Sequence, residues 1–146
     1  MAAPVTDLSA AMVTAPVPPA HWLAILPVVL CISLGALLLM LRSLPRLQAW
    51  IAITGLVVLL LLDAALLQQV VGHGPLTMVM GRWLPPFGIA FTVDVFSALM
   101  ALAAAVAALA AGIYALSDTT ESGRRYGFFP LLMLLMAGVT GAFLTG

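Results

Sequence analysis

The chain of 146 residues is strongly apolar, with 64% hydrophobic and only 7% charged residues. An ordinary soluble domain carries about 25% charged residues, so this chain lacks the polar side chains that would cover its apolar surface in water. Its formal net charge is zero and it contains no lysine. These features exclude a basic surface for nucleic acid and an acidic tail for a basic partner. The composition therefore predicts an integral membrane protein in contact with lipid.

Four apolar stretches are long enough to cross a bilayer, because a hydrocarbon core about 30 Å thick takes about 20 residues of helix. The predicted fold is all-α, with about four transmembrane helices in one membrane domain over residues 21–146. The spans are expected at residues 22–41, 49–71, 95–116 and 128–144. Residues 1–20 contain four prolines and no basic region of the kind that opens a signal peptide. We expect them to form a disordered tail.

The arginines predict how the chain is oriented. Arg42 and Arg46 lie between the first and second predicted spans. Arg124 and Arg125 lie between the third and fourth, whereas the opposite side has only Arg82. Short loops rich in arginine stay in the cytoplasm. We therefore expect a multi-pass protein of a bacterial plasma membrane, with the N-terminus outside and both arginine-containing loops inside the cell.

The interval between the second and third spans predicts a β-hairpin over about residues 74–93. Its turn signal is formed by Pro85, Pro86 and Gly88. After the turn, apolar Phe91 and Val93 alternate with more polar residues, as expected for a strand with one buried face. The arginine pattern places this hairpin outside the cell. An isolated hairpin is marginal in water, so it is expected to dock on another segment or chain.

Asp63 is the one ionisable residue near the middle of a predicted span. Such a residue costs about 2.5–3.5 kcal/mol at a helix centre, which makes it a candidate for function. Asp63 is either a protonatable group on an ion path or a neutral acid that hydrogen-bonds to a neighbouring helix. No intramembrane lysine, arginine or histidine is present to pair with it, so the second interpretation is slightly favoured and the first stays open.

The other polar residues predict ordinary structural roles. His73 is expected to be solvated, and Asp94 is expected to cap the helix that follows it. Four hydroxyl side chains are expected to bond back to their own helices, namely Ser33, Thr54, Thr140 and Thr145. The sequence contains no nucleophile–base pair, phosphate-binding loop or metal-ligand cluster, and Cys31 is its only cysteine. We therefore expect no catalytic residues, no metal and no cofactor.

Small residues in the third and fourth spans predict close helix packing. The third span is rich in alanine and contains Gly112, and the fourth contains Gly138, Gly141 and Ala142. Small side chains let helix backbones approach each other closely within lipid. These faces are more than a single four-helix bundle needs, so we expect neighbouring helices from other chains.

Two stretches resemble a known family. They are GRWLPPFGIAFTVDVFSALM at residues 81–100 and RRYGFFPLLMLLMAGVTGAFLTG at residues 124–146. Their Trp-Leu-Pro-Pro-Phe-Gly turn, the carboxylate before an alanine-rich helix and the Tyr-Gly-Phe-Phe-Pro motif closely resemble the N-terminal part of the D subunit of Mrp-type multisubunit Na+/H+ antiporters. More broadly, they resemble the antiporter-like subunits of respiratory complex I. The similarity covers about residues 50–146.

The resemblance implies a subunit that helps to couple proton movement to sodium export. Its partners would be membrane lipid, the other subunits of the complex and the rest of the antiporter-like subunit, and the transported ions would be protons and Na+. In the family, the functional glutamate and lysines follow the segment that this sequence matches, which ends at Gly146. None of them can therefore be assigned to a residue here, and Asp63 is not part of the family pattern. Residues 1–146 are therefore expected to have a mainly structural role. Alternatives are an assembly subunit without transport, or a small four-span proton-coupled exporter that uses Asp63.

Overall fold

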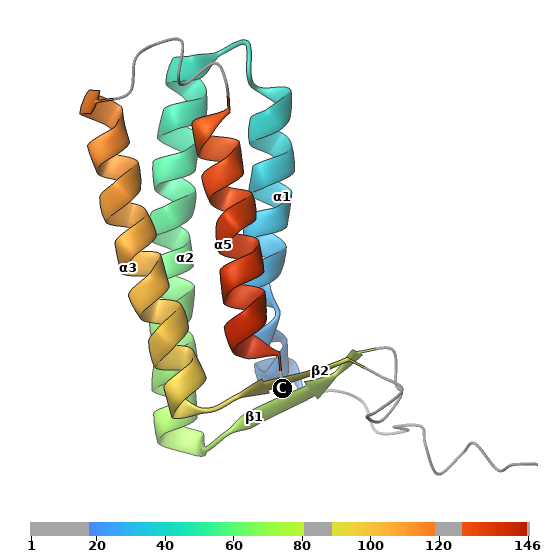
Figure 1. Ribbon diagram of the computed structural model, residues 1–146. Helices are drawn as coiled ribbons and strands as arrows, with labels where there is room; N and C mark the ends of the chain where they lie inside the picture. The colour runs from blue at the N-terminus through green and yellow to red at the C-terminus, as the bar shows by residue number, and fades with distance from the viewer. Residues whose placement is uncertain (1–17, 81–88, 119–126, 146) are drawn as a thin grey trace, which may run out of the picture.

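The computed structural model describes residues 18–80, 89–118 and 127–145. These residues form four α-helices, a short 3₁₀ helix and two β-strands (Figure 1). The α-helices are α1 (Leu26–Met40), α2 (Pro45–His73), α3 (Val95–Asp118) and α5 (Phe128–Leu144). The 3₁₀ helix η2 covers Pro19–Ala24, and the strands are β1 (Leu76–Val79) and β2 (Ala90–Val93).

The four α-helices run side by side along one axis, and helices that follow each other in the chain are antiparallel (Figure 1). α1 and α3 each pack against both α2 and α5, so the helices occupy the corners of a square. α2 and α5 are parallel to each other and also make contact across the diagonal. The α1–α2 loop lies at one end of the bundle, and the two strands lie at the other (Figure 1).

Helix length distinguishes two of the four helices as candidate membrane spans. α2 has 29 residues, and α3 contains a largely apolar stretch of 23 residues over Val95–Ser117, so both are long enough to cross a bilayer. α1 has 15 residues and α5 has 17, which correspond to about 22 and 26 Å of helix. They are apolar but shorter than the core of about 30 Å. That the chain crosses the membrane four times therefore stays a prediction.

Two prolines determine where the first two α-helices begin. Pro27 lies in the first turn of α1, and Pro45 is the first residue of α2. Proline is favoured at these positions because a first-turn N–H has no partner within the helix, and its fixed φ suits the helix. The first predicted span, residues 22–41, is accordingly not α-helical throughout: its first residues belong to η2, and the α-helix starts at Leu26.

Small side chains on α3 let it pack closely against α2 and α5. One face of α3 is buried and consists of alanine and glycine at spacings of three and four residues, namely Ala98, Ala101, Ala105, Ala108, Gly112 and Ala115. The opposite face exposes large apolar side chains such as Val106, Ile113 and Tyr114. This distribution suits a helix that packs through small residues and contacts lipid through large ones.

The two strands form an antiparallel pair in which Leu76 lies opposite Val93 and Met78 lies opposite Phe91. These four side chains are buried, whereas Thr77 and Thr92 are exposed. The strands predicted for residues 74–93 are therefore present, with Phe91 and Val93 on the buried face as expected. The turn residues Pro85, Pro86 and Gly88 lie outside the described residues, and so does most of the predicted tail, residues 1–20. The placement of the hairpin outside the cell stays a prediction.

The hairpin docks on segments of its own chain. Its buried face joins a hydrophobic cluster with the ends of the helices, including Val70, Ala98 and Leu144. The Nδ1 atom of His21 in η2 donates a hydrogen bond to the backbone oxygen of Thr77, at 2.7 Å. Beyond α5, Thr145 forms an antiparallel bridge with Phe91 of β2. These contacts supply the docking partner that an isolated hairpin needs.

The glycines predicted to pack differ in their surroundings. At Gly112, an added Cβ would lie 2.9 Å from Cδ1 of Leu56 and 3.1 Å from Cδ1 of Ile53, both on α2. At Gly138 and Gly141, an added Cβ would meet no atom within 4 Å. Ala142 is exposed. Gly112 thus packs inside the bundle, whereas the small residues of α5 face away from the described part of the chain.

Replacing Gly112 with leucine should crowd the α2–α3 contact. We expect a loss of about 1–3 kcal/mol in the free energy of unfolding, as is usual for overpacking in a core. Thermal unfolding of the detergent-solubilised protein measures this loss. Gly138→Leu is the control, because its side chain enters open space and should leave the unfolding midpoint of the bundle unchanged. Equal midpoints for Gly112→Leu and wild type would contradict the close α2–α3 packing.

Candidate functional site in the bundle interior

Asp63 lies on the buried face of α2, between Leu59 and Leu66. Its side chain is 0% exposed. Neither carboxyl oxygen has a hydrogen-bond partner among the described residues. Leaving a buried polar group unsatisfied costs about 1–3 kcal/mol, and more if the group is charged. Asp63 is therefore a feature that packing alone does not explain.

Thr140 on α5 is a second buried polar residue without a partner. Three of the four hydroxyls expected to bond to their own helices do so: Ser33 donates to the oxygen of Leu30 at 3.0 Å, Thr54 to that of Trp50 at 2.9 Å, and Thr145 to that of Gly141 at 2.6 Å. For Thr140 the expectation is wrong. Its side chain is 0% exposed, and its hydroxyl has no partner among the described residues. It lies on the face of α5 that points into the bundle.

Asp63 and Thr140 occupy the same level of the bundle. Gly55 of α2 faces Met133 of α5, since a Cβ on Gly55 would lie 3.1 Å from Cε of Met133. Asp63 is about 12 Å further along α2 than Gly55, and Thr140 is about 10 Å further along the parallel α5 than Met133, at 1.5 Å per residue. Two buried polar residues therefore lie at one depth on the two helices that meet across the diagonal.

The hydrophobic core is interrupted at this depth. One buried cluster reaches Leu59 on α2 and Ala137 on α5. The second cluster begins at Leu66 on α2 and includes Leu144 on α5. Asp63 lies between the clusters on α2, and Thr140 lies between them on α5. We call these two residues the polar layer.

Two further buried groups lie outside the polar layer. Cys31 of α1 is fully buried. Gln48, near the start of α2, donates from Nε2 to the backbone oxygen of Leu38 at 2.8 Å. That oxygen lies in the last turn of α1, where helix carbonyls lack partners of their own. This hydrogen bond therefore links the start of α2 to the end of α1.

Asp94 caps α3, as expected. The backbone N–H of Ser97 donates to Oδ1 of Asp94 at 2.6 Å, and the backbone N–H of Asp94 donates to Oγ of Ser97 at 2.9 Å. This reciprocal pair is a capping box. The hydrogen bonds from Ser97 hold the pKa of Asp94 below its usual value. Asp94 is therefore an ionised surface carboxylate with a structural role.

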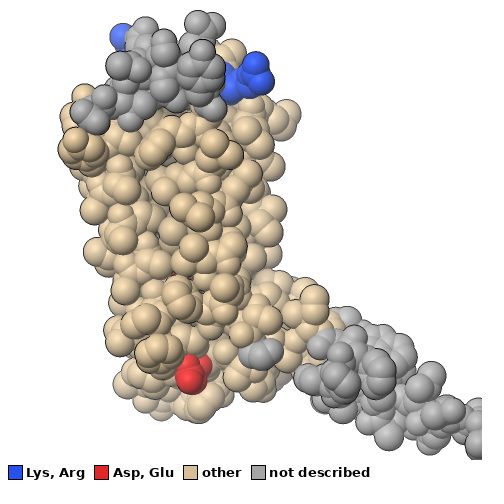
Figure 2. Space-filling view, in the orientation of Figure 1, with Lys and Arg blue, Asp and Glu red and all other residues tan. Residues whose placement is uncertain are grey.

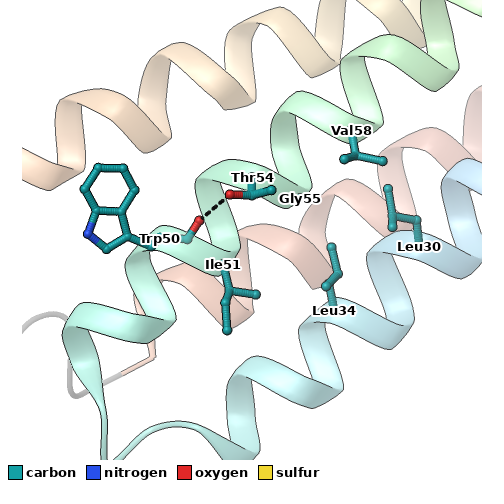
Figure 3. Close-up of a pocket in the computed structure, with 7 residues that line it drawn as sticks. All are labelled: Leu30, Leu34, Trp50, Ile51, Thr54, Gly55 and Val58. Atoms are coloured by element: carbon teal, nitrogen blue, oxygen red, sulfur yellow. Dashed lines mark hydrogen bonds between the residues drawn. The ribbon is translucent and has the colours of Figure 1, made fainter.

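An open groove of about 310 Å³ lies between α1 and α2. Figure 3 shows its lining, which is almost entirely apolar and consists of Leu30, Leu34, Trp50, Ile51, Thr54, Gly55 and Val58. The hydroxyl of Thr54 is occupied by its bond to the oxygen of Trp50. The residues that line the groove therefore offer no titratable group and no free hydroxyl.

The charged residues that the structure describes lie mainly at the ends of the bundle. Arg42 and Arg46 are exposed in and beside the α1–α2 loop, and His73 is exposed at the end of α2. Figure 2 shows the visible side of the bundle uncharged between its two ends. Arg124 and Arg125 lie outside the described residues. Within residues 18–80, 89–118 and 127–145, no group of three or more metal-binding side chains occurs.

Thr140, Gln48 and Ser97 are buried polar residues whose roles the sequence did not reveal. For Thr140 a signal was available: it continues a row of residues on α5 spaced by three or four positions, which includes Phe129, Met133 and Met136. A threonine in such a row points into the bundle. For Gln48 no local signal exists, because its partner Leu38 belongs to the preceding helix.

Comparisons with known proteins identify relatives, although no protein-family model matches the chain. It is 32% identical over 124 residues to the D subunit of a Na+/H+ antiporter of Alkalihalophilus pseudofirmus, covering 85% of this chain and 25% of that protein. It is 34% identical over 87 residues to the D subunit of a Na+/H+ antiporter of Bacillus subtilis, covering 60% of this chain and 18% of that protein. The D subunit of a probable K+/H+ antiporter of Rhizobium meliloti is 35% identical over 85% of this chain and 24% of its own length.

The chain thus spans about a quarter, or less, of the length of these relatives. Its apolar helices, together with these relatives, indicate a membrane protein. The similarity extends over most of the described bundle and agrees with the resemblance seen in its motifs. The chain belongs to the family of D subunits of multisubunit Na+/H+ antiporters.

Proposed function

We propose that this chain is part of a multisubunit cation/proton antiporter of a bacterial plasma membrane, and that its bundle has a mainly structural role there. The observation that carries the proposal is the similarity to antiporter D subunits over about 85% of the chain. Named relatives exchange protons for either Na+ or K+. Protons and one of these cations are therefore the proposed transported ions of the complex.

The proposed topology has four spans and both ends of the bundle in water. α1, α2, α3 and α5 each cross the membrane, with the α1–α2 loop in the cytoplasm and the hairpin outside. Support comes from exposed Arg42 and Arg46 at one end of the bundle and from the rule that arginine-rich loops stay inside. The opposite end carries the ionised Asp94 and the exposed threonines of the hairpin.

The proposed structural role uses the outer face of α5. Gly138, Gly141 and Ala142 leave this face open, with room for a close helix contact. In lipid, such small faces are where helices of different chains associate. We assign this face to a helix of another polypeptide in the antiporter complex.

Cation/proton exchange by the complex should depend on this chain. In inverted membrane vesicles that hold a proton gradient, addition of NaCl or KCl should dissipate the gradient, as followed with a pH-sensitive dye. Deleting the gene should abolish this response, and expressing the chain again should restore it. An unchanged response without the chain would contradict the proposal. A choline chloride addition controls for osmotic effects.

Labelling of introduced cysteines should reveal the orientation. Thr77→Cys on the hairpin should react with a membrane-impermeant maleimide in intact cells. Ser43→Cys in the α1–α2 loop should react only after the cells are opened. Native Cys31 gives a low background because it is fully buried. Reversed accessibility of the two positions would contradict the proposed topology.

Enlarging Gly141 should weaken assembly rather than the fold of the bundle. In Gly141→Leu we expect less intact complex after affinity purification, because the added side chain prevents close approach of a neighbouring helix. The amount of the chain in the membrane should stay the same. Gly141→Ala is the matched control and should assemble nearly as well as wild type. Normal recovery of Gly141→Leu complex would exclude a close contact at this face.

A further inference from the structure

We propose that Asp63 of α2 and Thr140 of α5 form a buried proton-binding site that takes up and releases one proton during cation/proton exchange. The existence of the site follows from the bundle itself. Its use in exchange rests on the proposed function. Nothing in the names of the relatives assigns a role to either residue.

The polar layer interrupts an otherwise apolar core without completing a hydrogen-bond network. Buried polar groups in proteins are nearly always paired. Here, both oxygens of Asp63 and the hydroxyl of Thr140 lack partners among the described residues. A half-satisfied polar pair weakens a core relative to apolar residues of similar volume. A purely structural explanation of the layer therefore fails, because apolar side chains would hold these helices together better.

The surroundings of the layer favour a proton over a larger ligand. Both side chains are fully enclosed, and one hydrophobic cluster lies on each side of them along the bundle. A hydrated cation, or a basic side chain from another polypeptide, would bring its charge into this apolar interior at a high cost in solvation. A proton can be handed over by a single small molecule such as water. It also removes the charge that makes a buried carboxylate unfavourable.

No described cation faces Asp63 from the helices around it. On α1 the buried titratable residue is Cys31, whose thiol carries no positive charge. α5 contains no titratable residue, and on α3 the described Tyr114 is exposed. On α2 itself, Arg46 and His73 lie near the two ends and are exposed. Asp63 therefore lacks an ion-pair partner in the described residues, and neutralisation by a proton is the way to bury it.

The proposed step changes one O–H bond. The two side chains are not hydrogen-bonded to each other in the structure; in the proposed protonated state, the Asp63 carboxyl rotates so that its O–H donates to the hydroxyl oxygen of Thr140. When a water molecule enters between the helices and accepts the proton, that O–H bond breaks, its electron pair stays on the carboxylate, and the proton leaves as hydronium. The Thr140 hydroxyl then rotates and donates to the carboxylate, which partly compensates the new charge. Return of one proton restores the first state.

Exchange by the assembled complex tests this role with three variants and a matched control. Asp63→Asn removes the titratable proton and keeps the shape, so exchange in vesicles should fall by about 100-fold or more, as is usual for loss of a proton-transfer group. Thr140→Val should also lower exchange, and Thr140→Ser should restore it because serine keeps the hydroxyl. Thr54→Val is the control, since that hydroxyl bonds only to its own helix. Wild-type exchange by an assembled Asp63→Asn complex would overturn the proposal.

A chemical measurement tests the protonated state without relying on transport. A lipophilic carbodiimide adds to a protonated carboxyl: the acid proton moves to a carbodiimide nitrogen, the oxygen bonds to the central carbon, and rearrangement gives a stable N-acylurea. In wild-type complex kept in its native membrane, peptide mass spectrometry should find this adduct on Asp63. Asp94 is the internal control, because it is exposed and ionised. A water-soluble carbodiimide with an added amine should instead modify Asp94.

The two experiments separate the failure of this inference from the failure of the proposed function. If wild-type vesicles show no exchange, the proposed function fails, and the adduct still decides whether Asp63 holds a proton. If wild type exchanges ions but Asp63→Asn exchanges equally well, only the inference fails. If Asp63→Asn does not assemble, the Thr140→Val and Thr140→Ser pair and the adduct decide. An unmodified Asp63 together with full exchange by Thr140→Val would overturn the proton site.

Discussion

Close approach of α3 to α2 and α5 is the contact on which the rest of the bundle depends. Alanine and glycine on the inner face of α3 bring the helix backbones together, and the large side chains point outward. In lipid, the hydrophobic effect does not drive helices together, so dispersion contacts between closely packed backbones must hold them in place. This arrangement places α2 and α5 across the short diagonal of the bundle. It thereby encloses whatever polar side chains those two helices direct inward.

The ends and the middle of the bundle meet different physical requirements. At the ends, most of the described polar groups bond locally: Ser97 and Asp94 cap α3, Nε2 of Gln48 donates to a carbonyl of α1, and His21 holds β1, whereas Oε1 of Gln48 has no partner among the described residues. These bonds fix the helix termini and the hairpin in place. In the middle, Asp63 and Thr140 are left without such partners in the described residues. Asp63 is the one described carboxyl group that is buried with both oxygens unpartnered, which is why we add a proton-binding role in the middle to the structural role of the bundle.

Much of this fold could be predicted because lipid makes hydropathy a direct signal. The apolar stretches, the alternation of Phe91 and Val93 and the cap at Asp94 are local patterns, and the structure contains the corresponding elements. The start of α1 was less predictable, since Pro27 and the preceding 3₁₀ helix divide one apolar stretch. The site was only half predictable. Asp63 stood out as a carboxylate in an apolar run, whereas the place of Thr140 depends on how two helices distant in sequence are aligned. The packing partner of Gly112 and the open face at Gly141 likewise depend on tertiary arrangement.

Native mass spectrometry of the chain extracted gently from its own membrane tests most directly whether it is a component of a larger antiporter complex. We predict that the polypeptide containing these residues is recovered in a large assembly with several other membrane proteins. Dissociation of that assembly in the gas phase should release the polypeptide and report its mass. Recovery of the chain alone, as a monomer or dimer of 15.2 kDa polypeptides, would contradict membership of the complex and would favour a small independent exporter.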